Sequence, residues 1–410
     1  MATPDAILIV CGGLLQVPAV PVARELGLEV VITDANPEAP AMRLADDPVV
    51  LDIYDVPGHL ALVDELRSRY RLRGVFAEGA DVEVTVAAAA RHAGLPGITV
   101  EAAENTKNKV RMRQCFDRAG IPNPRWAEVS SAGQAYDAAI RIGLPLMVKA
   151  VDNSASRGTT RITELARLGD AVELARANST TRTALLESCF IGEEQSVEIL
   201  FDERGAAHHL NVVDRPFTTD GPYAIELGHV NPSKLSRSDQ AILFRLTEEA
   251  ARATGVGFGA FKSDTIWTSD GPRILEVTAR LSGGFDCQYT TPLSTGRNFI
   301  RAAMRLAVGM PLDPADLRHR WHRYAAAWVA FPEPGRVRRI RGIEKALELP
   351  GVKEVFLRIA VGDIVLPARD CATRPAFVIA VGESREEAIR NAQRGVDALT
   401  IETEETANAV

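Results

Sequence analysis

Short apolar runs alternate with segments of helical periodicity over residues 6–100, and no other feature restricts the fold of this chain as strongly. The runs predict strands at Ile7–Cys11, Glu29–Thr33, Pro48–Asp52, Gly74–Ala77 and Gly97–Thr99. Helical segments such as Leu60–Tyr70 and Val82–Ala93 lie between them. Strands that are joined through helices pair in parallel. The sequence therefore predicts an α/β domain with an open parallel sheet in residues 1–100.

A glycine pair follows the first predicted strand, which raises the question of a dinucleotide site. Gly12-Gly13 precedes a helix, and Asp34 ends the second predicted strand. The full GxGxxG pattern of such sites is absent. We favour a structural turn here and keep an NAD(P) oxidoreductase as the rival function from another class.

The middle of the chain, residues 145–290, is richer in strands than in helices. Predicted strands are Leu146–Ala150, Thr159–Ile162, Ala184–Glu187, Glu194–Phe201, His208–Val213, Phe258–Thr268 and Arg273–Leu281. Predicted helices are 101–125, 132–142, 165–178, 236–254 and Asn298–Val308. This arrangement is typical of an α+β unit, which we place at residues 101–308.

A turn-rich segment, Gly309–Pro314, marks the predicted start of a third unit, residues 309–410. Strands are expected at Tyr324–Phe331, Val352–Leu357 and Ala376–Ala380, with a closing helix at Glu383–Leu399. We expect a small α+β lobe whose last residues, Glu402–Val410, are frayed.

The charge balance disfavours nucleic-acid and membrane-surface partners. The chain has 47 Lys and Arg against 54 Asp and Glu, a net charge of −7, so no basic excess is available to cover phosphates.

The five cysteines are dispersed without a CxxC pair, which is typical of reduced thiols. The uncharged stretch Ile7–Ala23 has no basic segment before it and is interrupted by Gly and Pro, which favours cytoplasmic residence.

Residues 259–281 predict a β-hairpin with one polar face. Asp270-Gly271-Pro272 is a turn signal between two β-rich runs. A turn at this point sets Asp264 opposite Glu276. The residues on the polar face are Lys262, Asp264, Glu276, Thr278 and Arg280, and those on the other face are Phe261, Leu275, Val277 and Leu281.

Two carboxylates that face each other across a hairpin repel unless positive charge lies between them. Lys262 and Arg280 flank the pair and could supply this charge as an ion-pair network. A Mg²⁺ ion is the other candidate, because a hard divalent cation binds carboxylate and phosphate oxygens. The sequence leaves both alternatives open.

Three further segments carry charged residues at predicted element ends. Lys149 ends an apolar strand and precedes a loop of small residues, 152–160, whose backbone amides could approach an anion. Glu187 and Glu194 lie at the ends of neighbouring strands, on either side of Gly192. Asn105–Arg113 is a basic helix turn. Each of these alone is also typical of a solvated surface.

Taken in chain order, these segments resemble the ATP-grasp superfamily. Asn108-Lys109 with Ala119–Pro124 resembles its entry helix, and Val148-Lys149 with Ser156-Arg157-Gly158 its second lysine and phosphate loop. Glu187 with Gly192-Glu193-Glu194 resembles the adenosine-binding hinge, and Asp264 with Glu276–Arg280 the metal hairpin. The resemblance makes residues 1–100 a Rossmann-like domain, 101–308 the ATP-grasp domain with a lid at about 146–190, and 309–410 a C-terminal lobe.

The resemblance implies a role for each matching residue. Nucleotide binding is implied for Lys109, Lys149, Ser156, Arg157, Gly158, Glu187, Phe190 and Glu194. Binding of Mg²⁺, with Mn²⁺ as the alternative, is implied for Asp264, Glu276 and Thr278. Arg280, Gly283, Gly284 and His229 are the implied catalytic residues. Thr278 stands where the family commonly has asparagine, and Ala155 replaces a usual loop glycine.

Two segments, Glu226–Ser233 and Arg280–Asp286, are similar to those of L-amino-acid ligases that make dipeptides, as are Pro350–Val352 and Ala376–Gly382 near the end of the chain. The implied function is an ATP-dependent carboxylate–amine ligase. It would form an acyl phosphate, couple it to an amine and release ADP and phosphate. Amino-acid-like substrates follow from the same resemblance, and a homodimer is one option. An ATP-dependent carboxylase and a non-catalytic ATP-binding scaffold remain the alternatives.

Overall fold

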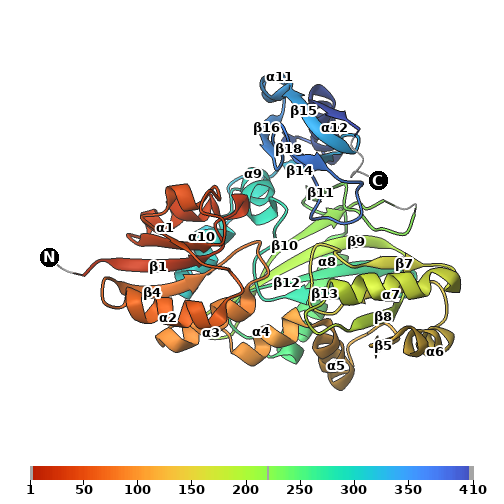
Figure 1. Cartoon of the computed structure of the whole chain (residues 1–410). Coiled ribbons are helices and arrows are strands. Elements are labelled where there is room, and N and C mark those ends of the chain that lie inside the picture. Colours follow the sequence, from red (N-terminus) through yellow and green to blue (C-terminus); the bar gives the residue numbers. More distant parts are fainter. Residues whose placement is uncertain (1–2, 219–220, 406–410) are drawn as a thin grey trace.

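The computed structural model describes residues 3–218 and 221–405. Its N-terminal part, red to orange in Figure 1, contains the predicted parallel sheet. The strand order is β3-β2-β1-β4. The strands are β1 (Asp5–Val10), β2 (Glu29–Asp34), β3 (Asp47–Val50) and β4 (Arg71–Phe76). The predicted fifth strand at Gly97–Thr99 is wrong. Thr99 instead caps the next helix, because its side-chain oxygen accepts a hydrogen bond from the Ala102 amide.

Helices cover both faces of this sheet. On one face, α2 (Val56–Leu66) and α3 (Glu83–Ala93) enclose an apolar core. On the other face, α1 (Ala19–Glu25) is joined by α10 (Phe299–Ala307), which comes from far along the chain. Because α10 buries Phe299 and Met304 in the core of this domain, the central part of the chain is anchored to the N-terminal sheet.

The glycine pair after β1 forms a structural turn. The Asp34 carboxylate accepts hydrogen bonds from the Gly12 amide at 2.8 Å and from the Asn36 amide at 2.9 Å. A Cβ at Gly12 would lie 2.6 Å from Met42 Cγ, so the glycine permits a close approach of two segments. Asp34 therefore serves the turn, as we favoured from the sequence.

The predicted helix at 101–125 is two helices, α4 (Val100–Lys107) and α5 (Lys109–Ala119). The break falls at Asn108, whose side-chain oxygen accepts hydrogen bonds from the amides of Val110 and Arg111. An asparagine in this capping role satisfies the first free amides of a helix. The break places Lys109 at the first position of α5.

A second, four-stranded sheet has the order β5-β8-β6-β7. Its strands are β5 (Trp126–Val129), β6 (Leu146–Ala150), β7 (Thr160–Ile162) and β8 (Ala184–Ser188). Helices α6 (Ala132–Ile142) and α7 (Leu168–Ala177) pack on one face, against Leu146 and Val148. Because side chains alternate along a strand, Met147 and Lys149 point to the opposite face.

An eight-stranded sheet runs through the rest of the molecule in the order β13-β12-β9-β10-β11-β14-β18-β16. Its strands are β9 (Glu193–Phe201), β10 (Ala207–Arg215), β11 (Gly228–Asn231), β12 (Gly259–Thr268), β13 (Gly271–Thr278), β14 (Tyr324–Ala330), β16 (Val352–Leu357) and β18 (Ala376–Gly382). Helix α8 (Arg237–Thr254) packs on β9, β12 and β13, at one end of the sheet. The sheet crosses the predicted boundary at 309, so the division into domains stays a prediction.

The C-terminal lobe also carries a small sheet of order β17-β15-β19, with strands β15 (Gly335–Arg341), β17 (Ile364–Val365) and β19 (Thr400–Glu404). The helices α9 (Thr291–Thr295), α11 (Ile343–Leu347) and α12 (Arg385–Ala398) complete this part. The predicted fraying is wrong for residues 402–404, which pair with β15, while 406–410 lie outside the described residues.

Within 3–218 and 221–405, no helix has the length and hydropathy needed to cross a membrane.

Replacing Phe299 by alanine tests the anchoring role of α10. Phe299 is fully buried, and removing a buried aromatic ring costs about 3–5 kcal/mol of stability. We expect Phe299→Ala to lower the midpoint of urea unfolding and to speed proteolysis between the N-terminal sheet and the rest of the chain. Arg390→Ala, at an exposed position of α12, is the control and should leave both unchanged.

Candidate active site

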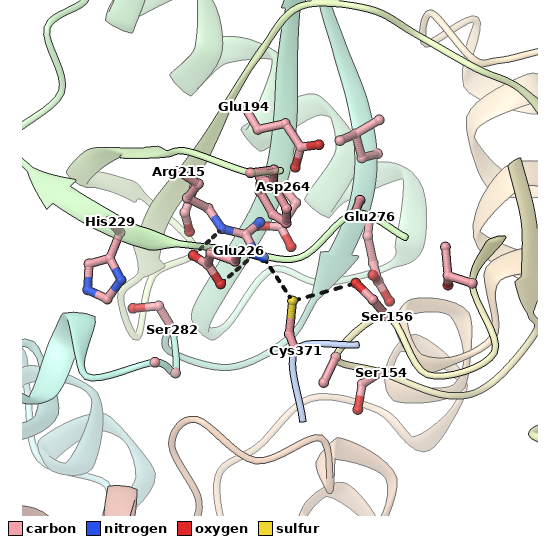
Figure 2. A pocket seen from close by; sticks show the side chains of 18 of the residues that line it. Ser154, Ser156, Glu194, Arg215, Glu226, His229, Asp264, Glu276, Ser282 and Cys371 are labelled. Atoms are coloured by element: carbon pink, nitrogen blue, oxygen red, sulfur yellow. Dashed lines mark hydrogen bonds and ion pairs between the residues drawn. The ribbon is translucent and has the colours of Figure 1, made fainter. Parts of the chain in front are cut away.

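A cleft of about 1110 Å³ opens between the four-stranded sheet β5-β8-β6-β7, called the lid sheet below, the eight-stranded sheet, the N-terminal part and the C-terminal lobe (Figure 2). It brings together nearly all the site residues predicted from the sequence. Those that line it are Lys109, Lys149, Ser156, Arg157, Glu187, Phe190, Glu194, His229, Asp264, Glu276, Thr278, Arg280, Gly283 and Gly284. Gly158 is the exception and does not line the cleft.

The β12–β13 hairpin has the predicted register. Asp264 pairs with Glu276 and Lys262 with Thr278. A β-bulge next to Asp264 shifts the alternation by one residue. Leu275 consequently lines the cleft, and Ile274 is buried in the core in its place. The prediction that Leu275 belongs to the apolar face is therefore wrong.

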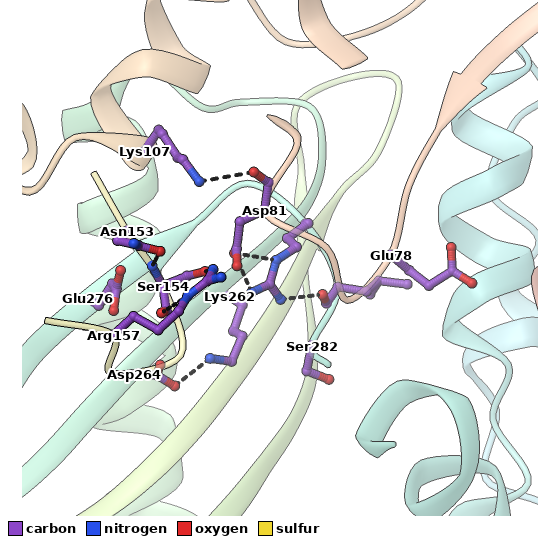
Figure 3. A network of polar contacts seen from close by, with 12 residues as sticks. Glu78, Asp81, Lys107, Asn153, Ser154, Arg157, Lys262, Asp264, Glu276 and Ser282 are labelled. Carbon is purple, nitrogen blue, oxygen red and sulfur yellow. Dashed lines mark hydrogen bonds and ion pairs between the residues drawn. The ribbon is translucent and has the colours of Figure 1, made fainter. Parts of the chain in front are cut away.

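Two cations neutralise Asp264. Lys262 Nζ lies 2.5 Å from its carboxylate and Arg215 Nη1 lies 2.7 Å from it. Burial raises the pKa of Asp264, but the charges of Arg215 and Lys262 outweigh burial and lower the pKa overall. Arg280, the other predicted flanking cation, instead binds Asp81 at 2.6 Å (Figure 3). Arg215 was not predicted from the sequence, because its strand is not adjacent to the hairpin in the chain.

Glu276, across the hairpin, is bound by a lysine from a third element. Lys109 Nζ lies 2.7 Å from Glu276 Oε1 and donates to the Asn153 carbonyl at 2.6 Å. The Lys109 backbone amide also donates to the Val151 carbonyl. The first residue of α5 thus connects the hairpin to the loop that follows β6.

The Glu187 carboxylate binds two cations, one at each oxygen. Arg113 Nε and Lys149 Nζ each lie 2.6 Å from one of its oxygens. Burial opposes ionisation, but Arg113 and then Lys149 lower the pKa of Glu187 to about 2. Arg113, which the sequence analysis did not single out, is fully buried. This triad fixes the position of the Lys149 ammonium at the cleft wall.

The loop after β6 turns sharply at the cleft. Ala155 and Ser156 adopt positive φ angles of 55° and 61°, a region that costs L-residues about 1–2 kcal/mol each. Arg157 donates to the Ser154 carbonyl and hydroxyl. A Cβ at Gly158 would lie 2.8 Å from Asn178 Cβ, so Gly158 serves the packing of the loop.

The connection from the lid sheet to β9 also needs its glycine. A Cβ at Gly192 would lie 2.0 Å from the Trp267 carbonyl oxygen, so any larger residue would displace the hinge. Phe190 and Glu194 line the cleft on either side. Burial raises the pKa of Glu194 to about 7, although Arg215 opposes this shift.

The hairpin offers a set of oxygen atoms that fits a hard cation. The Asp264 and Glu276 carboxylates are in register, and the buried Thr278 hydroxyl has no hydrogen-bond partner. In the described part of the chain, His, Cys, Asp and Glu side chains form no cluster of three or more that could hold a metal. Two carboxylates and a hydroxyl leave positions for phosphate oxygens and water, as Mg²⁺ sites usually do.

A second ionic network extends from Asp264 to the C-terminal lobe. Arg215 Nε lies 3.0 Å from Glu226 Oε1, and Arg374 Nη1 lies 2.7 Å from Glu226 Oε2. Burial raises the pKa of Glu226, but Arg215 and Arg374 lower it below its usual range. Neither Glu226 nor Arg374 was predicted as a site residue, because the two are 148 positions apart in the chain.

His229 lies beside the glycines that were predicted to act in catalysis. A Cβ at Gly284 would be 3.7 Å from His229 Cε1. His229 is buried, and its Nε2 has no hydrogen-bond partner in the described structure. Burial lowers the pKa of His229, although Asp286 and Glu226 oppose this shift. A neutral imidazole with one unsatisfied nitrogen is therefore adjacent to Gly283 and Gly284.

Comparisons with known proteins find two matching domain families and a similar solved structure. The ATP-grasp domain family matches residues 142–288, and the L-amino acid ligase C-terminal domain 2 matches residues 327–404. The crystal structure of the L-amino acid ligase from Bacillus licheniformis has a TM-score of 0.83 at 23% identity, covering 99% of this chain and 100% of that one. This likeness confirms the predicted fold class.

Two relatives are similar to this chain in sequence. An uncharacterised protein of Sinorhizobium fredii is 27% identical over 92% of this chain and 78% of that protein. D-alanine–D-alanine ligase of Azoarcus sp. is 28% identical over 56% of this chain and 72% of that enzyme. The chain is an ATP-grasp ligase with the C-terminal domain of the L-amino acid ligases, as its sequence motifs predicted.

Replacing Glu187 by glutamine tests the ion-pair triad. The change leaves two buried cations without their anion, and breaking a buried ion pair costs about 3–5 kcal/mol. Because the folded pKa is depressed, to about 2, the stabilisation is complete above the ordinary value of 4.5. It is lost as the pH falls from there through the folded pKa.

We therefore expect a large difference in urea midpoint between wild type and Glu187→Gln at pH 7, and a smaller difference at pH 3. Glu128→Gln, at an exposed position of β5, is the control. A difference that stays constant between pH 7 and pH 3 would contradict the charged triad.

Proposed function

We propose that this ATP-grasp ligase joins an amino-acid-like carboxylate to an amine in two steps. In the first, a carboxylate oxygen attacks the γ-phosphorus of ATP, the bond to the β-phosphate oxygen breaks, and ADP leaves. In the second, the amine nitrogen attacks the acyl carbon, the carbon–oxygen bond to phosphate breaks, and the nitrogen loses a proton. The match to the L-amino acid ligase C-terminal domain and the D-alanine–D-alanine ligase relative support amino-acid substrates.

One observation carries the proposal. Cations and carboxylates from separate elements meet in a single cleft: Lys109 from α5, Lys149 from β6 and the Asp264–Glu276 pair from the hairpin. Phosphoryl transfer depends mainly on positioning and on neutralising phosphate charge. A triphosphate placed among these groups would bind lysines that Glu187 and Glu276 already hold in position.

The nucleotide would lie between the lid sheet and the hairpin. We assign Lys109, Lys149, Ser156 and Arg157 to its phosphates, and Phe190 and Glu194 to the adenosine hinge. Glu187 positions Lys149 through their 2.6 Å contact, and this role is compatible with hydrogen bonding to the adenine amine. Gly158 shapes the loop without contacting the cleft.

Asp264, Glu276 and the Thr278 hydroxyl would hold Mg²⁺ or Mn²⁺. When bound, this ion would neutralise phosphate charge during transfer. Lys262 and Arg215 orient Asp264, and Lys109 orients Glu276. These side chains therefore hold the carboxylate oxygens in position before a metal ion binds.

We assign the acyl-transfer centre to the segment that follows the hairpin and to His229. Asp81 fixes Arg280 through hydrogen bonds from Nε and Nη2, so the guanidinium can face the transferred phosphoryl group. We assign the amides of Gly283 and Gly284 to the oxyanion of the tetrahedral intermediate. The neutral His229 beside them has an unsatisfied nitrogen, which suits it to contact the substrates.

Substitutions in the hairpin and in β6 test the nucleotide and metal assignments. We expect Glu276→Gln and Lys149→Met to lower kcat for ADP release about 100-fold or more, because each removes a group that offsets phosphate charge. Glu344→Gln, at an exposed position of α11, should retain wild-type activity. The measurement is ADP release with pairs of amino acids, with products identified by mass spectrometry.

The same assay separates the rival functions. Ligase activity requires that ADP release depend on both a carboxylate and an amine. ADP release that depends on bicarbonate without an amine would favour a carboxylase. Full turnover by Glu276→Gln would contradict the metal assignment.

A further inference from the structure

Ser282 begins the turn that carries the two predicted catalytic glycines, and buried partners hold all three of its polar groups. Its amide donates to Glu198 Oε1 at 2.7 Å, and its hydroxyl donates to Asp286 Oδ2 at 3.0 Å. Its carbonyl accepts hydrogen bonds from Cys287 Sγ at 3.0 Å and from Gln288 Nε2 at 3.2 Å. Ser282 and these four partners are buried. The position of this residue is therefore fixed by each of its polar groups.

The Asp286 carboxylate is the centre of this set of hydrogen bonds. Its Oδ1 accepts from Thr290 Oγ1 at 2.9 Å, from Thr291 Oγ1 at 3.1 Å and from Asn231 Nδ2 at 3.2 Å. Asn231 is the last residue of β11 and Thr291 is the first residue of α9. The carboxylate thus connects the turn to the eight-stranded sheet and to α9.

Glu198, on β9, holds Ser282 from the other side. It is fully buried, and its Oε2 has no hydrogen-bond partner in the described structure. Burial and the charge of Asp286 raise the pKa of Glu198 to about 7, although the hydrogen bonds from Ser282 oppose this shift. A carboxylate that is buried near a second one is unfavourable for stability. Such an arrangement, bridged by one serine, indicates a role other than stabilising the fold.

The backbone that follows Ser282 is strained. Gly284 and Phe285 have φ angles of 67° and 75°, and the second of these is costly for a residue with a bulky side chain. A π-helical turn, Asp286–Thr290, comes next, and such turns are rare and occur frequently at functional sites. The Phe285 ring is stacked on Phe356 of the C-terminal lobe, with ring centres 4.3 Å apart. Contacts on both sides therefore hold the turn in this conformation.

The turn lies at the wall of the cleft. Ser282 lines the cleft (Figure 2), and so do Gly283 and Gly284. The amides of the two glycines are the groups that we assign to the oxyanion of the second step. Amides in this role are effective when they are aligned with the oxygen before the reaction, because no reorganisation then opposes the formation of charge. The contacts of Ser282 supply such alignment.

The cations assigned to phosphoryl transfer are held by other contacts. Lys109, Lys149 and Arg280 each bind a carboxylate that does not belong to the turn. A change at Ser282 is therefore expected to disturb the second step of the reaction far more than the first.

We propose that Ser282 is a positioning residue for acyl transfer, which sets the direction of the Gly283 and Gly284 amides through its hydrogen bonds to Glu198 and Asp286. This inference rests on the proposed function. Attack of the amine on the acyl phosphate depends on these hydrogen bonds, whereas formation of the acyl phosphate does not.

A rapid-quench experiment, with an acid and an amine that wild type couples, separates the two steps. ADP formed in the first turnover reports phosphoryl transfer, and coupled product reports attack by the amine. We expect Ser282→Ala to form ADP at the wild-type rate and to form product about 10- to 100-fold more slowly. Water then competes with the amine for the acyl phosphate and returns the free acid and phosphate, so the ratio of product to ADP should also fall.

Asp286→Asn is the conservative variant. Its side-chain amide can donate to the Ser282 hydroxyl, which can rotate to accept, so we expect a product rate closer to wild type than that of Ser282→Ala. Thr254→Val is the matched control. It removes a fully buried hydroxyl that donates to carbonyls of α8 and does not line the cleft, and it should keep both rates.

Two results would overturn the inference. The first is a product rate in Ser282→Ala equal to that of wild type. The second is a fall of the ADP and product rates by the same factor, with an unchanged ratio of product to ADP, which would leave Ser282 with a structural role or one in phosphoryl transfer. Absence of ADP release by wild type with every acid and amine tried would instead refute the proposed function, and this inference with it.

Discussion

Two carboxylates face each other across the β12–β13 hairpin, and the arrangement of the cleft follows from the need to neutralise them. Asp264 and Glu276 are in register, a placement that is unfavourable without positive charge nearby. The chain supplies this charge from three different elements: Lys262 on the same strand, Arg215 on β10 and Lys109 at the start of α5. Each of these ion pairs also fixes the position of the element that carries the cation. Neutralising the two carboxylates therefore also determines how these elements are arranged around the cleft.

The ionic contacts continue in both directions from this pair. Toward the lid sheet, Glu187 joins Arg113 to Lys149. Toward the C-terminal lobe, Glu226 joins Arg215 to Arg374. Buried ion pairs contribute little net stability to the folded state. Removing only one partner of such a pair, however, is strongly destabilising. The network therefore defines where each charged group lies more than it stabilises the fold, which suits a site that has to position a highly charged substrate.

The local sequence pattern predicted the hairpin correctly, but it carries no information on contacts between residues that are far apart in the chain. The turn at Asp270-Gly271-Pro272 and the two-residue period of strands were sufficient for the register of Asp264 with Glu276. The bulge that turns Leu275 into the cleft leaves no such signal. β15 was missed because Arg338 and Arg339 are adjacent, at a bulge that interrupts the alternation of apolar and charged residues. Thr99 was taken for a strand residue because a capping threonine and a β-branched strand residue look alike in sequence. Arg113, Arg215 and Arg374 contact partners far along the chain, which one sequence without structure does not reveal.

The C-terminal lobe contacts the loop after β6 through its backbone. The Cys371 amide donates to the Ala155 carbonyl at 2.9 Å, and the Cys371 thiol accepts a hydrogen bond from the Glu226 amide at 3.4 Å. A movement of the loop away from the lobe must break the first of these bonds, and a movement of the segment around Cys371 must break both. The position of the loop that follows β6 is therefore coupled to the position of a segment more than 200 residues further along the chain.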